Sequence, residues 1–518
     1  MCGGEVLGWV VGESSPERSV VVFKTEAAGR VRAGSYIVGE SIDGCVLGIV
    51  ERLVAGSSLY PGNVSSPEVI DSLWQTVGGA EYYLRGHVRW LSRVEDLERG
   101  RIASPRYPAI PGSTVSSAGE DLLSKVFSPP GPGWVRLGEL QPSGVEYRVN
   151  VNRLTRHLAI LAVTGGGKSN TVCILARRLV EGLGATIVLF DMHGEYGDLG
   201  LGGRARIWSP ASVNPASLSF RELMQLVRMP PQATNQERIL RWAWRNALEF
   251  YRRGLVRGSE VLDTARRLVE ALMGGSTREV RLGEDLRAPN PPQGVKPDQV
   301  QGVLNKLDDL HDYYSDALNP GTPLRLENII EPGKLTVFDL SSLDEQGADA
   351  VASHYLRRIL QERKNYRGGG RGYPKPLLVF IEEAHVLIPS NSNTLTKYWA
   401  ARIAREGRKF GIGLALVSQR PKNVDADVLS QTNNKIILRM VEPQDIRYVQ
   451  AASEELSDDL TTLLPSLNPG EAVVIGSMTR LPALVKIDEC RERRGGGDID
   501  LVAEWATPEE DVIEEVFQ

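Results

Sequence analysis

A glycine-rich stretch at Ala162–Ser169, which reads A-V-T-G-G-G-K-S, constrains the fold of this chain more than any other feature. It continues from an apolar segment that begins at Leu158 and leads into a segment whose apolar side chains recur at helical spacing. The glycines allow successive backbone N–H groups to turn towards one point, and the N-terminus of the following helix adds its dipole. The sequence therefore predicts a strand, a phosphate-binding loop and a helix in direct succession.

The predicted loop supplies the groups that a nucleotide and its metal require. We expect the polyphosphate to be bound by consecutive residues, namely Thr164, Gly165, Gly166, Gly167, Lys168, Ser169 and Asn170. The ammonium of Lys168 should reach the β- and γ-phosphates and the hydroxyl of Ser169 should bind Mg²⁺, so ATP and Mg²⁺ are the expected cofactors. Ala162 replaces the first glycine of the motif, which weakens the match, and a glycine-rich turn without function is the alternative interpretation.

Around this loop, apolar strands alternate with amphipathic helices, which is the pattern of a parallel sheet covered on both faces. The predicted strands are Leu158–Val163, Thr186–Phe190, Leu335–Leu340, Leu377–Ile381, Gly413–Val417, Lys435–Leu438, Ala472–Ile475 and Ala483–Ile487. A stretch of helical periodicity at 220–319 interrupts the series and predicts an inserted helical subdomain. The fold class is therefore α/β, with a P-loop ATPase core formed by 151–219 and 320–490.

The first 150 residues have a different pattern, in which short β-rich stretches alternate with glycine turns. This pattern is typical of a small barrel or sandwich. Its clearest strands are Glu5–Val11, Ser19–Phe23, Tyr36–Val38, Cys45–Val54 and Tyr82–Leu91. A connector rich in proline and glycine at 128–133 precedes the expected domain boundary before Val151, so 1–150 is predicted to be an N-terminal β domain with its connector. The charged residues 491–518 are predicted to form a C-terminal tail, either solvated or bound to a neighbouring subunit.

Acidic side chains follow two of the predicted strands, at the edge where an open α/β sheet binds its ligands. Glu382 and Glu383 come directly after Leu377–Ile381, and Asp191 follows Thr186–Phe190. We expect Glu382 to hold Mg²⁺ through a metal-bound water and Glu383 to polarise the attacking water. Asp191 is expected to help hold the metal or the water. Two acids at an exposed strand end are the alternative interpretation.

Other polar residues at the same edge have further expected roles. Gln419 follows the strand Gly413–Val417 and is expected to sense the γ-phosphate. His193 and Glu195 belong to the segment D-M-H-G-E-Y, where they either take part in the site or only order the loop.

A second group of candidates is basic. The segment Arg405–Phe410 contains four charges in a short connection between a predicted helix and a strand. A solvated helix end is the usual meaning of such a run. In ring-shaped ATPases this edge meets the neighbouring subunit, where an arginine can stabilise charge on the transferring phosphoryl group. Arg408, Arg405 and Arg156 are the candidates for that role.

Composition excludes several classes of protein. The net charge of -5 supplies no global attraction for DNA, so any DNA-binding cations must be concentrated locally, as in the channel of a ring. The 4 cysteines are scattered singly, which predicts reduced, structural thiols, and the 6 dispersed histidines suggest no metal cluster. No apolar run is long enough to span a bilayer, so we expect a cytoplasmic protein without a membrane partner.

At these motifs the sequence resembles the HerA family of archaeal and bacterial DNA translocases, which are relatives of the FtsK motors. The resemblance covers nearly the whole chain. It is carried by four segments that few P-loop families share, namely Thr164–Thr171, Asp191–Tyr196, Phe380–His385 and the stretch from Ile403 through Gly411 to Ser418-Gln419-Arg420-Pro421.

The resemblance implies a RecA-like motor core with a small N-terminal barrel, assembled as a homohexamer around double-stranded DNA. It also implies a NurA-type nuclease as partner in the resection of broken ends. The family's phosphate-loop lysine, strand-end glutamate and second-strand aspartate fall on Lys168, Glu383 and Asp191, and Arg408 is the first candidate for the trans-acting arginine. Conjugative and protein-remodelling motors share this core. A nucleotide-dependent clamp on DNA without turnover is the alternative from another functional class.

Overall fold

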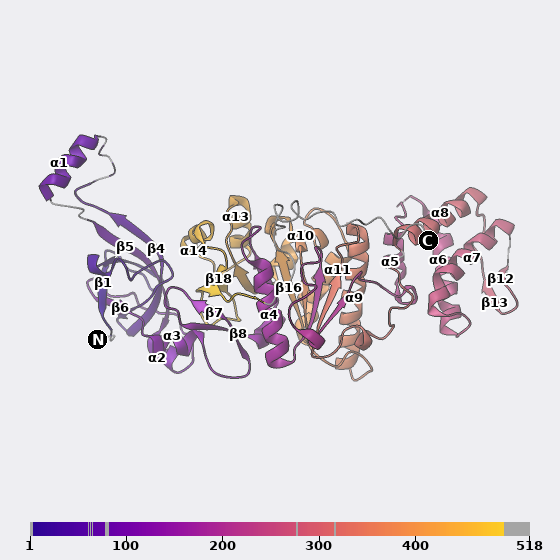
Figure 1. Cartoon of the computed structure of the whole chain (residues 1–518), viewed down its shortest axis with the longest axis horizontal. Coiled ribbons are helices and arrows are strands. Elements are labelled where there is room, and N and C mark those ends of the chain that lie inside the picture. Colours follow the sequence, from indigo (N-terminus) through magenta and orange to yellow (C-terminus); the bar gives the residue numbers. More distant parts are fainter. Residues whose placement is uncertain are drawn as a thin grey trace, which may run out of the picture.

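The computed structural model describes residues 4–491, except 61, 63, 65, 78–81, 231, 276–277 and 315–316. Figure 1 shows a barrel, a large sheet covered by helices, and a helical subdomain following one another along the long axis of the molecule. The predicted α/β class, with a P-loop core, an N-terminal barrel and inserted helices, is confirmed. Within the described residues, none of the helices is both long and apolar enough to cross a membrane. The predicted tail lies outside the described residues, apart from Arg491.

The N-terminal barrel is closed and antiparallel, with the strand order β1-β2-β5-β4-β3-β6. Its strands are β1 (Val6–Val11), β2 (Arg18–Phe23), β3 (Tyr36–Ser41), β4 (Gly44–Gly56), β5 (Tyr83–Arg93) and β6 (Thr114–Ser117). The ring of Trp90 fills the interior and requires two glycines beside it, because a Cβ at Gly39 or Gly48 would lie 2.5 or 2.6 Å from the ring. β6 closes the barrel at the end of a stretch rich in proline, glycine and serine, 105–117, in which no strand is expected from the sequence.

Three short helices accompany the barrel, α1 (Pro67–Val77), α2 (Val94–Glu98) and α3 (Glu120–Phe127). Figure 1 shows α1 beyond the ends of β4 and β5, away from the rest of the molecule. The barrel is joined to the core by specific bonds: the hydroxyl of Tyr36 donates to the carbonyl of Pro482 at 2.6 Å, and that of Ser457 donates to Glu51 at 2.6 Å. A hydrophobic cluster also continues from β3 and β4 into the sheet domain.

The core contains an 11-stranded sheet with the order β11-β14-β10-β15-β16-β9-β17-β18-β19-β7-β8. Its strands are β7 (Trp134–Leu140), β8 (Glu146–Asn150), β9 (Leu158–Leu161), β10 (Thr186–Asp191), β11 (Ala205–Trp208), β14 (Leu335–Asp339), β15 (Leu377–Ile381), β16 (Ile412–Ser418), β17 (Asn434–Ile437), β18 (Glu471–Ile475) and β19 (Ala483–Ile487). Neighbouring strands pair in parallel from β11 to β17 and antiparallel from there to β8. Because parallel strands end at a common edge, the loops after β9, β10, β15 and β16 converge.

The sheet is buried on both faces. Its helices are α4 (Lys168–Leu183), α9 (Glu345–Arg367), α10 (Ala384–Leu387), α11 (Leu395–Glu406), α12 (Ala426–Ser430), α13 (Pro443–Ala451) and α14 (Asp458–Leu463). The apolar side of α4 belongs to one hydrophobic cluster, and those of α9 and α11 belong to another. The strands therefore read as continuous apolar runs rather than as alternating patterns.

The inserted subdomain is built from α5 (Phe220–Leu226), α6 (Thr234–Arg252), α7 (Val261–Glu270) and α8 (Pro297–Tyr314). α6, α7 and α8 pack around Trp244, whose side chain is fully buried. A hairpin of β12 (Glu279–Leu282) and β13 (Leu286–Pro289) lies between α7 and α8, where the sequence predicts only breaks between helices.

Two strands that precede Val151 belong to the large sheet. β7 pairs with β19 and β8 pairs with β7, so the chain enters the core sheet from its antiparallel end before it reaches the phosphate-binding loop. The domain limits given above remain a proposal. The pairing places β7 and β8, which precede Val151, in the core sheet rather than in the barrel.

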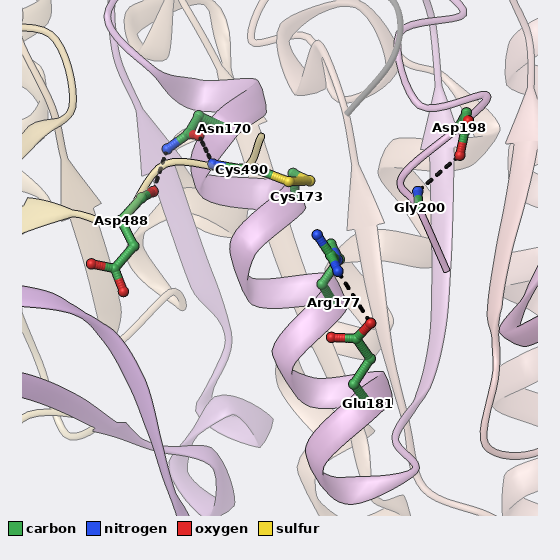
Figure 2. The surroundings of a disulfide bond; sticks show 8 residues. All are labelled: Asn170, Cys173, Arg177, Glu181, Asp198, Gly200, Asp488 and Cys490. Atoms are coloured by element: carbon green, nitrogen blue, oxygen red, sulfur yellow. Dashed lines mark hydrogen bonds and ion pairs between the residues drawn. A yellow bond between two sulfur atoms is a disulfide. The ribbon is translucent and has the colours of Figure 1, made fainter. Parts of the chain in front are cut away.

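A disulfide joins Cys173 of α4 to Cys490, 317 positions further along the chain, with the Cα atoms 6.2 Å apart (Figure 2). The expectation of reduced cysteines is therefore wrong, and the described residues include no free cysteine. Next to it, the amide of Asn170 donates to the carbonyl of Asp488 at 2.9 Å and accepts from the N–H of Cys490 at 2.7 Å. These bonds hold the segment after β19 against the helix that follows the phosphate-binding loop.

Candidate active site

The phosphate-binding loop has the backbone that its glycines permit. Gly165 and Gly167 adopt φ angles of 73° and 105°, which side chains with a Cβ rarely adopt. A Cβ at Gly167 would also lie 3.1 Å from the side chain of Leu438 and 3.3 Å from the nitrogen of Gly470. α4 begins at Lys168, so its first N–H groups face the loop. The geometry is that of an anion-binding loop at a helix N-terminus.

Ala162 takes the place of a glycine without backbone strain. It is buried at the end of β9 and is not among the residues with positive φ. Its N–H donates to the carbonyl of Ser418 at 3.3 Å, which keeps the loop in line with β16. The substitution that weakens the sequence match therefore leaves the geometry of the loop intact.

Glu383 faces the loop across the edge of the sheet. Its backbone lies in the left-handed region with φ of 41°, directly after β15, and its side chain is buried. The carboxylate lies 3.7 Å from Nζ of Lys168 and 3.0 Å from Nδ1 of His385. Burial raises the pKa of Glu383, but the hydrogen bond with His385 and the charge of Lys168 outweigh burial and hold this pKa below its usual value. Glu383 is thus ionised at neutral pH beside the position of the phosphates.

Glu382 lies deeper than Glu383 and next to Asp191. One of its oxygens accepts from the hydroxyl of Tyr196 at 2.9 Å, and its side chain is almost fully buried. Burial and, after it, the charge of Asp191 raise the pKa of Glu382 well above its usual value. Both oxygens of Asp191 accept backbone N–H bonds, from His193 at 3.2 Å and Tyr196 at 2.8 Å. Asp191 therefore orders the loop after β10.

The structure brings most of the predicted nucleotide-site residues together. Ser169 donates its hydroxyl to Glu195 at 2.6 Å, and Thr164 donates its hydroxyl to Gln419 at 2.6 Å. The side chain of Asn170 points instead to the segment after β19. Sequence reasoning left out His385 and Tyr196 as site residues, although both stand in the motifs E-E-A-H and D-M-H-G-E-Y.

The three candidate arginines lie elsewhere, at the edge of the sheet where the strands begin. Arg156 ends the turn before β9, and Arg405 and Arg408 precede β16. Burial and, after it, the charge of Arg408 lower the pKa of Arg156. The short helical segments 151–156 and 407–410, which carry these two arginines, are in contact. In the described part of the chain, no carboxylate forms an ion pair with any of the three arginines.

His157 connects the two segments that carry these arginines. Its ring is buried, contacts the carbonyl of Ala404 through Nε2 at 3.0 Å and accepts the N–H of Leu414 at Nδ1 at 3.0 Å. Burial lowers the pKa of His157 to about 4, so the ring is neutral and can accept at one nitrogen while donating at the other. The arginines are thus held in a fixed arrangement relative to one another.

The arginines cannot serve the phosphate-binding loop of their own chain. β16 separates Arg408 from Gln419, and its length of 7 residues spans roughly 20 Å at the usual rise of a strand. An extended arginine side chain is much shorter than this distance. If any of these arginines contacts a nucleotide, that nucleotide must be bound by another copy of the chain.

The polar groups around Ser169 fit a magnesium ion that arrives with a nucleotide. They are a hydroxyl and carboxylates, the oxygen ligands that Mg²⁺ prefers. The second oxygen of Glu382 is buried without a hydrogen-bond partner in the described residues. Over the same residues, no group of three or more His, Cys, Asp or Glu side chains is placed to hold a metal alone. Phosphate oxygens would therefore have to complete the ligand set.

Replacing Lys168 by alanine is expected to weaken ATP binding about 30-fold or more, as for other buried charge pairs that lose one partner. The ammonium is nearly buried and faces Glu383, so its loss leaves both the phosphate charge and this carboxylate uncompensated. Titration with a fluorescent ATP analogue measures the change, with Lys375→Ala, at the opposite end of β15, as the control. Affinity close to that of the unmodified protein would contradict the assignment.

Comparisons with known proteins agree with this geometry. The family described as helicase HerA, central domain, matches residues 135–359, and the helicase HerA-like C-terminal family matches residues 366–487. The DNA double-strand break repair helicase HerA of Sulfurisphaera tokodaii is 39% identical over 510 residues, which cover 98% of both chains. That of Saccharolobus solfataricus is 38% identical over 509 residues, covering 98% of this chain and 96% of the relative.

Among solved structures, VirB4 of Thermoanaerobacter pseudethanolicus has a similar fold, with a TM-score of 0.50 and 16% identity. The likeness covers 69% of this chain and 97% of VirB4. At this level of identity it concerns the fold alone.

Proposed function

Because the chain belongs to the HerA helicase family, we propose that it moves along double-stranded DNA as a hexameric ring driven by ATP hydrolysis. The relatives are named DNA double-strand break repair helicases, and this chain is an ATP-hydrolysing helicase of the same family. We further propose that it acts with a NurA-type nuclease in the resection of broken ends.

Each site residue has a role in the proposed hydrolysis. Lys168 neutralises the β- and γ-phosphates, and Ser169 and Glu382 would hold Mg²⁺, which would supply positive charge to the same phosphates. Glu383 aligns and polarises the attacking water, for which its ionised state is suited. Gln419, linked to Thr164 of the loop, is placed to sense the γ-phosphate.

The observation that carries the ring is the position of Arg156, Arg405 and Arg408. They gather at one edge of the sheet without acidic partners in the described residues, while the phosphate-binding loop lies at the other edge. In a ring, the arginines of each subunit can contact the nucleotide bound by the neighbouring subunit. One edge of the sheet then supplies the arginines, and the other edge binds the nucleotide. A lone subunit would leave this concentration of positive charge without a function.

A ring also reconciles DNA binding with the net charge of -5. Several subunits can direct a few lysine and arginine side chains into one channel while the outer surface stays acidic. The inward-facing cations then act together on the phosphates of one duplex. The nuclease partner would receive the DNA that leaves this channel.

A clamp that binds ATP and DNA without turnover is the alternative, and conjugative or protein-remodelling motors share the same core. The measurement that separates them is ATPase activity with and without duplex DNA. A motor on DNA is expected to hydrolyse ATP faster when duplex is present, and a clamp is not. Turnover that DNA leaves unchanged would reject the proposed function.

Duplex binding is expected to fall steeply with salt and to depend little on base sequence, because a moving motor must hold phosphates rather than read bases. A protein that contacts six or more phosphates loses about 10³-fold or more in affinity between 50 and 200 mM salt. Two duplexes of equal length and different sequence, titrated at several salt concentrations, measure both effects. A variant that stays monomeric and binds DNA as tightly as the ring would contradict the channel.

A further inference from the structure

Ser169 is already engaged by a carboxylate that the proposed function has not used. Its hydroxyl donates to Oε2 of Glu195 at 2.6 Å, although the two residues lie on different elements, at the start of α4 and in the loop after β10. This hydroxyl is the one that phosphate-binding loops offer to Mg²⁺. Glu195 therefore lies beside the position that the metal would take.

The loop is built so that the backbone of Glu195 stays in place while its side chain reaches the site. Asp191 accepts the N–H groups of Glu195 at 3.2 Å and Tyr196 at 2.8 Å. Gly194 adopts a φ of 70°, which turns the chain immediately before Glu195. Directly after Glu195, Tyr196 is buried, and its hydroxyl donates a hydrogen bond to Glu382 that holds this part of the loop.

The loop after β10 has other anchors besides the Glu195 side chain. Asp191 and the hydroxyl of Tyr196 hold the loop through groups other than the Glu195 side chain. The Glu195 carboxylate is half-buried and adds negative charge to a place that already contains Asp191 and Glu382. Such a concentration of carboxylates is unfavourable by itself and favourable when a cation is present.

A second observation points to a ligand at this place. Glu382 is 3% exposed, and its Oε2 has no hydrogen-bond partner among the described residues. A buried oxygen without a partner is costly unless a ligand or its water completes the site.

We propose that Glu195 is a magnesium-site residue: together with the hydroxyl of Ser169 it receives the Mg²⁺ that accompanies ATP. The inference rests on the proposed binding of Mg–ATP and adds a residue from the loop after β10 to the site. Glu195 supplies negative charge at the metal, while Lys168 and the loop N–H groups hold the phosphates. Its loss should therefore act on the metal and leave metal-free nucleotide binding intact.

The test titrates a fluorescent, non-hydrolysable ATP analogue against the full chain with increasing Mg²⁺ and, separately, with EDTA. In Glu195→Gln, the Mg²⁺ concentration that gives half of the gain in affinity is expected to rise about 10- to 100-fold, as for other residues that support a metal. Affinity in EDTA should be unchanged or higher, because one negative charge near the phosphates is gone. The amide oxygen still accepts the Ser169 hydroxyl, so the loop keeps its bond.

Asp198→Asn is the matched control, since Asp198 lies in the same loop and its exposed carboxylate accepts the N–H of Gly200 at 2.8 Å (Figure 2). It removes the same charge from the loop while the bond between Ser169 and Glu195 stays, and it should leave the Mg²⁺ dependence unaltered. Glu195→Asp retains the carboxylate, so its Mg²⁺ dependence should lie between those of the unmodified protein and Glu195→Gln.

Two results would overturn the inference. Unchanged Mg²⁺ dependence in Glu195→Gln would show that the carboxylate does not serve the metal, and an equal loss of affinity with and without Mg²⁺ would show that it only orders the loop. The proposed binding of Mg–ATP fails separately, if the unmodified protein binds the analogue equally well in Mg²⁺ and in EDTA.

Discussion

Replacing Arg408 by alanine is expected to lower ATP turnover about 10³- to 10⁵-fold, the range known for arginines that act across an interface on a transferring phosphoryl group. The guanidinium lies beside Arg156 at the edge of the sheet opposite to its own phosphate-binding loop. ATP binding to the same subunit should therefore stay close to normal. Steady-state turnover and nucleotide titration on one preparation separate the two effects.

Mixed rings decide whether Arg408 acts across the interface. Arg408→Ala and Lys168→Ala subunits are each expected to be inactive alone. When they are combined in one ring, some interfaces pair an intact Lys168 with an intact Arg408 from the neighbour, and part of the activity should return. If Arg408 served its own subunit, every site in the mixture would be broken and no activity would return.

Lys409→Ala is the control for these experiments, because Lys409 is the adjacent exposed cation. It should lose far less activity than Arg408→Ala, since a flexible ammonium does not match the planar guanidinium. Failure of mixed rings to recover, in rings shown to contain both subunits, would reject Arg408 and direct attention to Arg405 and Arg156.

Glu383→Gln is expected to bind ATP at least as tightly as the unmodified protein and to hydrolyse it about 10²- to 10⁴-fold more slowly, the usual contribution of a general base. The amide has the same shape, so the left-handed turn after β15 should be preserved. It cannot carry the negative charge that Lys168 and His385 stabilise in Glu383. Single-turnover hydrolysis with bound ATP measures the chemical step directly.

Glu383→Asp provides the comparison, because it retains the charge and withdraws the carboxylate by one methylene. Its rate should lie between those of the unmodified protein and Glu383→Gln. If Glu383→Gln lost binding and hydrolysis to the same extent, the residue would be part of the structure of the loop rather than the base.

Much of the core could be predicted because its signals are local. Strands buried on both faces read as apolar runs, and the glycines of the phosphate-binding loop are needed where the backbone adopts positive φ. β6 and the pair β7–β8 were harder to predict, because their places depend on partners far away in the sequence. β7 joins the sheet through β19, which follows more than 300 positions later.

The candidate site likewise combines residues that could be predicted from the sequence with contacts that could not. Lys168, Ser169, Glu382 and Glu383 could be predicted because each stands in a short motif at the end of a strand. That Ser169 bonds to Glu195, and that Lys168 lies 3.7 Å from Glu383, depends on the order in which the strands lie in the sheet. The order of the strands in the sheet cannot be recognised from any short stretch of the sequence.

The strand, loop and helix that bind phosphate could thus be predicted from local residues, since backbone conformation and helical periodicity are set by neighbours along the chain. Three relations depend on the folded chain instead: Cys173 pairs with Cys490, Asn170 turns away from the loop, and the candidate arginines lie at the edge of the sheet opposite the nucleotide. These relations join residues separated by hundreds of positions. They arise because the strands that run in one direction, β9 and β16 and also β19, end at one edge of the sheet and begin at the other.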